Sequence, residues 1–215
     1  SNMAYILATK LGMTRVFTDD GRSVGVTVLE AGPCTVTHVK TDESDGYQAV
    51  QLGFGHEKHP TKPVAGHQAK AKTTHKWLRE FRVAGNPTSP DGSTGASALP
   101  AVGDVLNVGT FEAGQAIKIV GVSKGKGFAG TIKRHNFKKG PGSHGSDQHR
   151  QPGSIGSGYP QRVFAGLRMA GHMGHERVSV AGATIQAIHP ETNLLVVTGP
   201  VPGPTKGLVL VQTAE

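Results

Sequence analysis

Short runs of apolar and β-branched residues recur along this chain, and turn residues separate them. Several runs alternate between apolar and polar or small residues, which is the period of a strand with one buried face. Gly, Pro, Asn and Asp lie between the runs, as at residues 19–21 and 32–33. Many short strands with such turns indicate a mainly β fold, a barrel or a sandwich, rather than a βαβ fold. The pattern predicts strands at residues 5–8, 24–29, 35–39, 47–54, 116–122, 177–188, 193–198 and 208–211.

The predicted strands form three groups, and long segments of a different character separate the groups. A single barrel can take its strands from all three. The first intervening segment has a helix candidate around residues 64–72 and a low-complexity loop at residues 86–100, which we expect to be mobile and peripheral. The predicted domains are a barrel at residues 3–55, 105–122 and 177–215, an α-containing insertion at 56–104, and an extended arm at 123–176.

Positive charge is concentrated in two parts of the chain. The 215 residues carry 23 Lys and Arg against 15 Asp and Glu, a net charge of +8. Residues 56–82 have seven basic and two acidic side chains, and residues 121–180 have ten and two. A protein that is basic only for solubility would spread its charge, so this distribution indicates a polyanionic partner such as a nucleic acid.

The second basic segment is also rich in glycine. Residues 121–177 contain 13 of the 31 glycines, and their apolar residues are sparse and show no sustained period. Such a segment cannot bury enough apolar surface to offset the entropy of ordering it. Glycine lets the backbone lie close to a partner, and Lys and Arg attract phosphates. We therefore expect an RNA-binding arm that is ordered against its partner.

An enzyme that binds a nucleotide is the alternative, because residues 125–130 match the G-x-G-x-x-G pattern after a predicted strand. That fingerprint requires a following helix and an acidic residue at a strand end about 20 positions later. Residues 131–137 are a poor helix, and Asp147 lies in a Gly-Ser-Asp-Gln-His context. The ending of a phosphate-binding loop is also absent, since Gly127 follows Lys126. No nucleophile with a base stands out, so we expect neither turnover nor a cofactor.

Metal binding and membrane attachment are also disfavoured. His144, His149, His172 and His175 could be metal ligands, but no cysteine joins them and their spacing is not compact. Histidine in a basic arm more often contacts a phosphate or a base. The single cysteine, Cys34, cannot form an internal disulfide, which fits a cytoplasmic location. No apolar run reaches the roughly 20 residues that span a bilayer, no amphipathic anchor is present, and no signal peptide pattern opens the chain.

Seven short motifs follow one another from residue 10 to residue 203. They are KLGMTRVF (10–17), GVSKGKGFAGTIKR (121–134), SHG (143–145), HRQPGSIG (149–156), RMAGHMGHERV (168–178), and NLLVV (193–197) with Gly199 and VPG (201–203). In this order they resemble the bacterial ribosomal protein L3 family, the third protein of the large subunit. A match that extends over nearly the whole chain is highly specific.

The resemblance implies a structural constituent of the large ribosomal subunit. It implies a six-stranded translation-protein-like β-barrel with a small α-containing insertion and a long irregular extension. In the family this extension threads into 23S rRNA toward the peptidyl-transferase centre, and the protein binds early and helps to nucleate subunit assembly. The implied partners are 23S rRNA and neighbouring ribosomal proteins, without a membrane or a small-molecule substrate. A free RNA chaperone outside the ribosome is the other RNA-binding alternative.

The arm then supplies three sets of candidate RNA-binding residues. The polar side chains expected to contact RNA are Lys124, Lys126, Lys133, Arg134, Lys138, Lys139, His144, His149, Arg150, Arg162, Arg168 and Arg177. The glycines expected to let the backbone approach RNA are Gly125, Gly127, Gly130, Gly153 and Gly156. The expected arm tip is Ser154, Ile155, Gly156, Ser157, Gly158 and Tyr159.

Three positions depart from the family pattern. Lys118 stands where the family usually has Asp or Asn. The loop after Gly156 lacks the Gln that directly follows this glycine in the commonest bacterial form. Some family members methylate a glutamine of this loop, and we do not transfer that modification to this chain. The loop at residues 86–100 is longer than usual, and we assign it no role.

Overall fold

The computed structural model describes residues 4–18, 20–83 and 100–214. The chain divides into two compact units. The larger unit comprises residues 1–122 and 177–215 and is called the body below, and the smaller comprises residues 123–176 and is called the arm.

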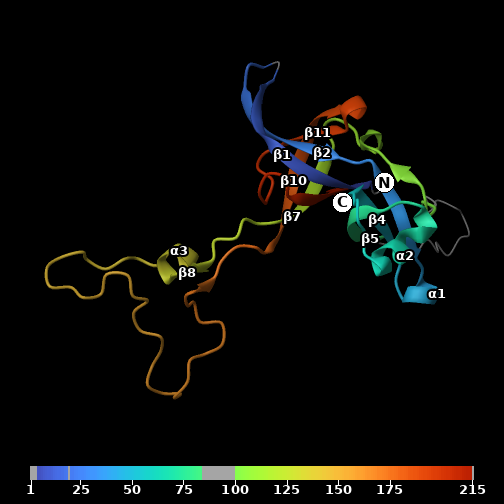
Figure 1. Ribbon diagram of the computed structural model, residues 1–215. Coiled ribbons are helices and arrows are strands. Elements are labelled where there is room, and N and C mark those ends of the chain that lie inside the picture. Colours follow the sequence, from blue (N-terminus) through green and yellow to red (C-terminus); the bar gives the residue numbers. More distant parts are fainter. Residues whose placement is uncertain (1–3, 19, 84–99, 215) are drawn as a thin grey trace, which may run out of the picture. The chain divides into compact units, whose positions relative to one another are not determined.

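Six strands of the described body close into an antiparallel barrel, in the order β1-β12-β7-β10-β11-β2 (Figure 1). The six-stranded barrel and the mainly β character are therefore confirmed. Strand β1 is much longer than the predicted residues 5–8, because its second half pairs with β2 as a hairpin. The barrel strands are β1 (Tyr5–Phe17), β2 (Ser23–Ala31), β7 (Ala116–Val122), β10 (Arg177–His189), β11 (Leu194–Thr198) and β12 (Leu208–Thr213).

The barrel interior is filled by alternate residues of its strands. On β7, Ile117 and Ile119 are fully buried, whereas Lys118 between them is half-buried. Ile119 is in register with Val211 of β12 on one side and Val180 of β10 on the other. Successive strand residues point to opposite faces, so this alternation places the β-branched residues inside.

Four further strands of the body form a second sheet, in the order β5-β4-β3-β6. The assignment of residues 3–55 and 105–122 to the barrel was therefore wrong for β3, β4 and β6. Alternation indicates which side chains are buried, but it does not say which strand is the hydrogen-bonding partner. The two sheets share one core, because Val36 and Leu52 cluster with barrel residues such as Leu7 and Leu29. The second sheet consists of β3 (Cys34–Lys40), β4 (Ala49–His56), β5 (His75–Arg82) and β6 (Val105–Leu106).

The insertion holds a helix close to the expected place. Helix α2 (Lys62–Gln68) begins earlier than predicted, with Pro63 in its first turn, and the following residues form a 3-10 turn, η1 (Ala69–Ala71). Strand β5 was missed, because four of its eight residues are Lys, Arg or Glu and obscure the buried Phe81. The low-complexity segment 86–100 lies outside the described residues except for its last residue.

The other helical elements of the body are short. None of the helices in the described part of the chain is long and apolar enough to cross a membrane. The remaining elements are α1 (Asp42–Asp45), η2 (Val108–Thr110) and η3 (Pro190–Thr192).

The single cysteine, Cys34, is buried, and this burial raises the pKa of its thiol to about 12.

The barrel core predicts the effect of truncating one β7 side chain. Ile119 is fully buried, so Ile119→Ala removes apolar contacts and leaves a cavity, and we expect it to lower the free energy of unfolding by about 2–5 kcal/mol. Val122, on the same strand, is 43% exposed, and Val122→Ala should cost less than about 1 kcal/mol. Urea denaturation of both variants measures the difference, and equal losses would contradict the assignment of Ile119 to the core.

Candidate nucleic-acid interface

The arm begins and ends as a backbone ladder. The N–H of Ser123 donates to the carbonyl of Glu176 at 2.9 Å, and the N–H of Lys126 donates to the carbonyl of Met173 at 2.9 Å. The N–H of Met173 donates to the carbonyl of Gly127 at 3.0 Å. Two short strands, β8 (Phe128–Ala129) and β9 (Gly171–His172), then continue the pairing. The two limbs of the arm are therefore held together from the base of the arm to β8 and β9.

A short helix follows this ladder, which corrects the expectation that residues 131–137 would not be helical. Helix α3 (Thr131–His135) is only five residues long, and Asn136 ends it in the left-handed conformation with a φ of 59°. Glycine precedes it and Asn tolerates left-handed φ, so the chain has a start and a stop signal for a single turn. The side chains of Arg134 and His135 both donate to the carbonyl of Met169, at 2.8 and 3.0 Å. Helix α3 thus fastens the return limb.

The glycine-rich loop before α3 does not have the geometry of a dinucleotide site. Its residues 126 and 127 use their backbone groups in the ladder with Met173. A helix of five residues also supplies only a small dipole to a phosphate. The nucleotide-binding alternative has no support in this geometry.

Beyond the helix, the arm forms two loops. The N–H of Gly140 donates to the carbonyl of His149 at 3.0 Å, and Nδ1 of His149 donates to the carbonyl of Pro141 at 2.8 Å, so the first loop is closed at its base. The second loop contains the expected tip, residues 154–159, and its hydrogen bonds are local, such as the one from Ser154 Oγ to the carbonyl of Gly156 at 3.2 Å. All tip residues are exposed.

The arm has almost no core of its own. Ala129 and Thr131 are its only buried residues, and the structure describes every residue from 123 to 176. Three aromatic side chains are instead largely exposed: Phe128 is 81%, Tyr159 84% and Phe164 60% accessible. Exposed aromatic rings between cations are suited to stacking on unpaired bases. Phe128 and Phe164 were not among the predicted site residues. Their position within a basic segment of the sequence could have indicated a role in RNA binding.

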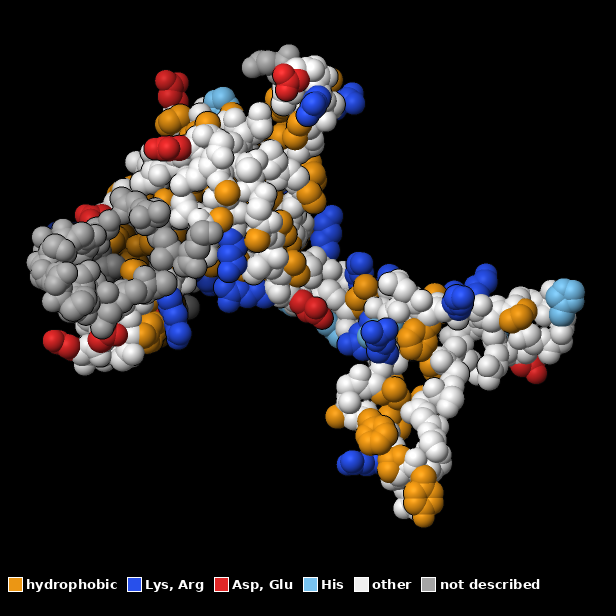
Figure 2. Space-filling model, turned by 180° about the vertical axis from the view of Figure 1, so that it is seen from behind, with side chains coloured by type: hydrophobic (Ala, Val, Ile, Leu, Met, Phe, Trp, Pro, Cys, Tyr) orange, Lys and Arg blue, Asp and Glu red, His pale blue; other side chains and the backbone are white. Residues whose placement is uncertain are grey.

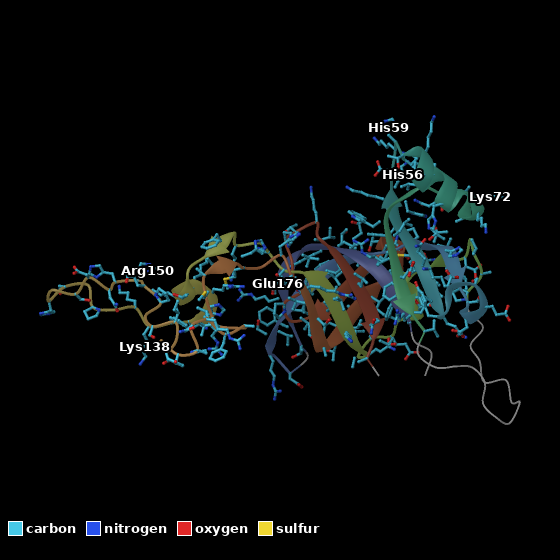
Figure 3. All side chains as sticks on the ribbon, turned by 90° about the horizontal axis from the view of Figure 1, so that it is seen from below. His56, His59, Lys72, Lys138, Arg150 and Glu176 are labelled. Carbon is cyan, nitrogen blue, oxygen red and sulfur yellow. The ribbon has the colours of Figure 1, made fainter. Side chains whose placement is uncertain are left out.

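The predicted cations are presented to solvent. Of the twelve polar side chains that we expected to contact RNA, only Arg134 is half-buried, and the others are exposed. Figure 2 shows Lys and Arg along the arm, and Figure 3 shows Lys138 and Arg150 on its adjacent limbs. Both ion pairs found in the described part of the chain involve Lys40 of the body. The charges of the arm are therefore not neutralised by its own acidic residues.

Two of the predicted residues have structural roles as well. Arg134 is committed to Met169, as described above, and its guanidinium also lies against Gly171, where a Cβ would be 3.0 Å from Nη1. Arg177 belongs to the first position of β10, where it pairs with Val122 of β7. His144, His172 and His175 are exposed, and no group of three His, Cys, Asp or Glu side chains in the described chain could hold a metal ion.

The glycines of the arm differ in the structural reason for which a side chain is disfavoured at their positions. Gly127, Gly153 and Gly156 have positive φ angles of 65°, 82° and 145°, so their own backbone conformation favours glycine. Gly125 and Gly130 have neither a positive φ nor a close neighbour, and a backbone approach by RNA is the proposal that remains for them. The two most constrained glycines of the arm are not among the predicted site residues: a Cβ at Gly140 would clash with the carbonyl of Gln148, and one at Gly174 with the carbonyl of Lys124.

Known proteins with a similar sequence belong to one family. Residues 61–193 match the model of a family described as Ribosomal protein L3. The chain is 50% identical to the large ribosomal subunit protein uL3 of Acidothermus cellulolyticus, over 97% of this chain and 91% of that protein. It is 48% identical to the protein of the same name from Herpetosiphon aurantiacus (97% and 95% covered), and 47% identical to that from Pelotomaculum thermopropionicum (97% and 96%).

The ladder of the arm predicts the effect of one glycine substitution. In Gly174→Ala, a residue with a φ of 75° acquires a Cβ that meets the carbonyl of Lys124, and left-handed φ alone costs roughly 1–2 kcal/mol. We expect amide exchange at Lys126 and Met173 to accelerate by roughly tenfold or more, while the barrel strands keep their protection. Gly142→Ala is the control, because a Cβ there meets nothing within 4 Å. Unchanged exchange in Gly174→Ala would show that the ladder does not depend on this residue.

Proposed function

Because this chain belongs to the ribosomal protein L3 family, we propose that it is a structural component of the large ribosomal subunit that binds 23S rRNA through its arm. The observation that carries this proposal is the set of exposed cations on the arm, which lack acidic partners and alternate with exposed aromatic rings. RNA offers both complements, namely phosphates for the cations and unpaired bases for the rings. No step of this function needs a cofactor or turnover.

The limbs and the tip of the arm have different roles in the proposed complex. Lys138 and Lys139 on the outgoing limb and Arg150 on the adjacent one contact phosphates and fix the arm in the RNA. Residues 154–159 form the end nearest the catalytic RNA, as the family resemblance implies. These tip residues are exposed and make only local hydrogen bonds, which supports a conformation that the RNA completes.

The wider context of the function follows from the family. The chain would act in the cytoplasm as part of the ribosome, bind rRNA early in assembly and contact neighbouring large-subunit proteins. The relatives named above are called large ribosomal subunit proteins, which supports this assignment.

Salt dependence tests the phosphate contacts of the arm. If six to ten phosphates are engaged, affinity for a 23S rRNA fragment should fall by roughly 10³–10⁵ between 50 and 200 mM salt. Replacing Lys138 and Lys139 together by Ala removes two contacts and should reduce the log–log salt slope by roughly 1.5. The matched control is Arg15→Ala with Arg22→Ala, which removes the same charge from exposed positions of the β1–β2 hairpin. A wild-type slope near zero would refute the proposal.

Sedimentation distinguishes a subunit component from a free RNA chaperone. The tagged chain, expressed in a bacterial cell and separated on a sucrose gradient, should migrate with the large subunit and with assembled ribosomes. Recovery of most of the protein at the top of the gradient would favour the chaperone.

A further inference from the structure

The body contains a cavity that the proposed function of the arm does not use. Its volume is about 920 Å³, within the range of ligand-binding clefts. One wall comes from the middle of β1 and the end of β2, with Thr9 and Glu30. The opposite wall comes from α2, η1 and the start of β5, with Lys72, Thr73 and Trp77.

Two glycines of β4 make room for the rings that line this cavity. A Cβ at Gly53 would clash with the ring of His75, and a Cβ at Gly55 would lie 2.9 Å from Cζ3 of Trp77. Trp77 also stacks on Phe54, with ring centroids 5.8 Å apart and an angle of 22° between the ring planes. The sequence Gly-Phe-Gly at residues 53–55 therefore builds an aromatic wall.

The opposite wall is fastened by a buried amide. Gln68 is fully buried; its Oε1 accepts from the N–H of His75 at 2.6 Å, and its Nε2 donates to the carbonyl of His75 at 3.1 Å. This pair of bonds joins the end of α2 to the start of β5. Because both partners belong to regular elements, the cavity is preformed rather than opened by a ligand.

Two polar atoms of this wall are buried without a partner. Nδ1 of His75 donates to the carbonyl of Gly55 at 3.2 Å, which leaves Nε2 as a bare acceptor. Burial lowers the pKa of His75, so the ring is neutral near pH 7. His75 Nε2 and Thr73 Oγ1 have no hydrogen-bond partner, although buried polar groups are nearly always paired. Together they provide an acceptor and a hydroxyl for a ligand that can donate hydrogen bonds.

The cavity is bordered by positive charge. Lys72 and Lys206 line it, and Glu30 is its one carboxylate, which accepts from Thr9 Oγ1 at 3.2 Å. Figure 3 shows His56, His59 and Lys72 around the α2 segment. Lys76 is exposed, and its Nζ lies 4.8 Å from the centroid of the Trp77 ring.

We propose that this cavity binds one unpaired nucleotide of single-stranded RNA, with the base against the aromatic wall and the flanking phosphates on Lys72 and Lys206. The choice of RNA as the polymer rests on the proposed function, but the site is separate from the arm. An aromatic wall, cations at the rim and unpaired polar atoms inside match the stacking, phosphate and edge contacts by which proteins hold unstacked bases. An apolar small molecule would leave the polar atoms and the cations unused.

The fluorescence of Trp77 reports occupancy, because it is the only tryptophan of the chain. Titration of the full-length protein with single-stranded hexa-adenylate RNA should quench this fluorescence in a saturable manner. A blunt RNA duplex with the same number of nucleotides should quench it far less, since its bases are paired and stacked. No saturable quenching by the single strand, or equal quenching by the duplex, would overturn the proposal.

A matched pair of lysine variants tests the rim. Lys72 has a φ of 53°, which Asn tolerates, so Lys72→Asn removes the charge without straining the backbone. It should weaken hexa-adenylate binding by roughly three- to fivefold, as expected for one exposed ionic contact, and lower the salt slope by about 0.7. Lys70→Asn, on the same segment but outside the cavity lining, should leave both unchanged. Equal effects of the two variants would mean that general charge attraction, and not this cavity, binds the RNA.

Thr73→Val tests the interior with a readout that separates binding from folding. Removing an unpaired buried hydroxyl should leave the stability unchanged or raise it, whereas loss of a ligand contact should weaken hexa-adenylate binding by roughly fivefold. Unchanged binding with raised stability would show that Thr73 is an unsatisfied group without a ligand, against the proposal.

The proposals for the arm and for the cavity can be tested independently of each other. The protein with Lys138→Ala and Lys139→Ala should keep the full quenching by hexa-adenylate, because neither residue lies in the body. If quenching is absent while the arm retains its salt-dependent binding of 23S rRNA, only the cavity proposal is wrong. If the arm shows no salt slope while quenching is normal, only the function of the arm is wrong.

Discussion

The pairing of Val122 with Arg177 is the constraint on which the arm depends. These residues stand opposite each other where β7 and β10 leave the barrel, and both strands are held by further neighbours within the closed sheet. The entropy of closing a loop grows only slowly with its length, so one fixed pair of ends can support a long excursion. The ladder then continues into the arm through Ser123 and Glu176 and through Lys126 and Met173. The barrel thus supplies the order that the sequence of the arm cannot generate.

The two units divide the physical work accordingly. The body has a continuous apolar core in which residues such as Ile6, Leu29 and Ile119 are fully buried. In the arm only Ala129 and Thr131 are buried, and α3 contributes one helical turn. A segment without a core typically gains its remaining order from a partner, and exposed cations without acidic neighbours favour an anionic one. The absence of a core in the arm and its exposed positive charge therefore both fit the proposed binding of RNA.

Much of this organisation could be predicted from the sequence, and the failures have physical causes. The β-branched runs of β7, β10 and β12 indicated barrel strands correctly, because period-two burial is visible in a single chain. The partner of a strand is not visible in this way, so β3 and β4 were placed in the wrong sheet. Strand β5 was obscured by its charged residues. Gly140 and Gly174 could not be identified from the sequence. A side chain at Gly140 is excluded by the carbonyl of Gln148 and one at Gly174 by the carbonyl of Lys124, and neither carbonyl belongs to a sequence neighbour of the glycine.

The uneven charge along the sequence has a structural counterpart. The two basic segments, residues 56–82 and 121–180, belong mainly to different units and present their cations in different surroundings. In the arm the cations are exposed on both limbs, where the proposed contacts are phosphates and the affinity is expected to fall as salt rises. Around the cavity the cations border an aromatic wall with unpaired polar atoms, where stacking adds a contribution that salt screens far less. A chain that joins both modes can hold RNA electrostatically through the arm and still distinguish an unpaired nucleotide at the body.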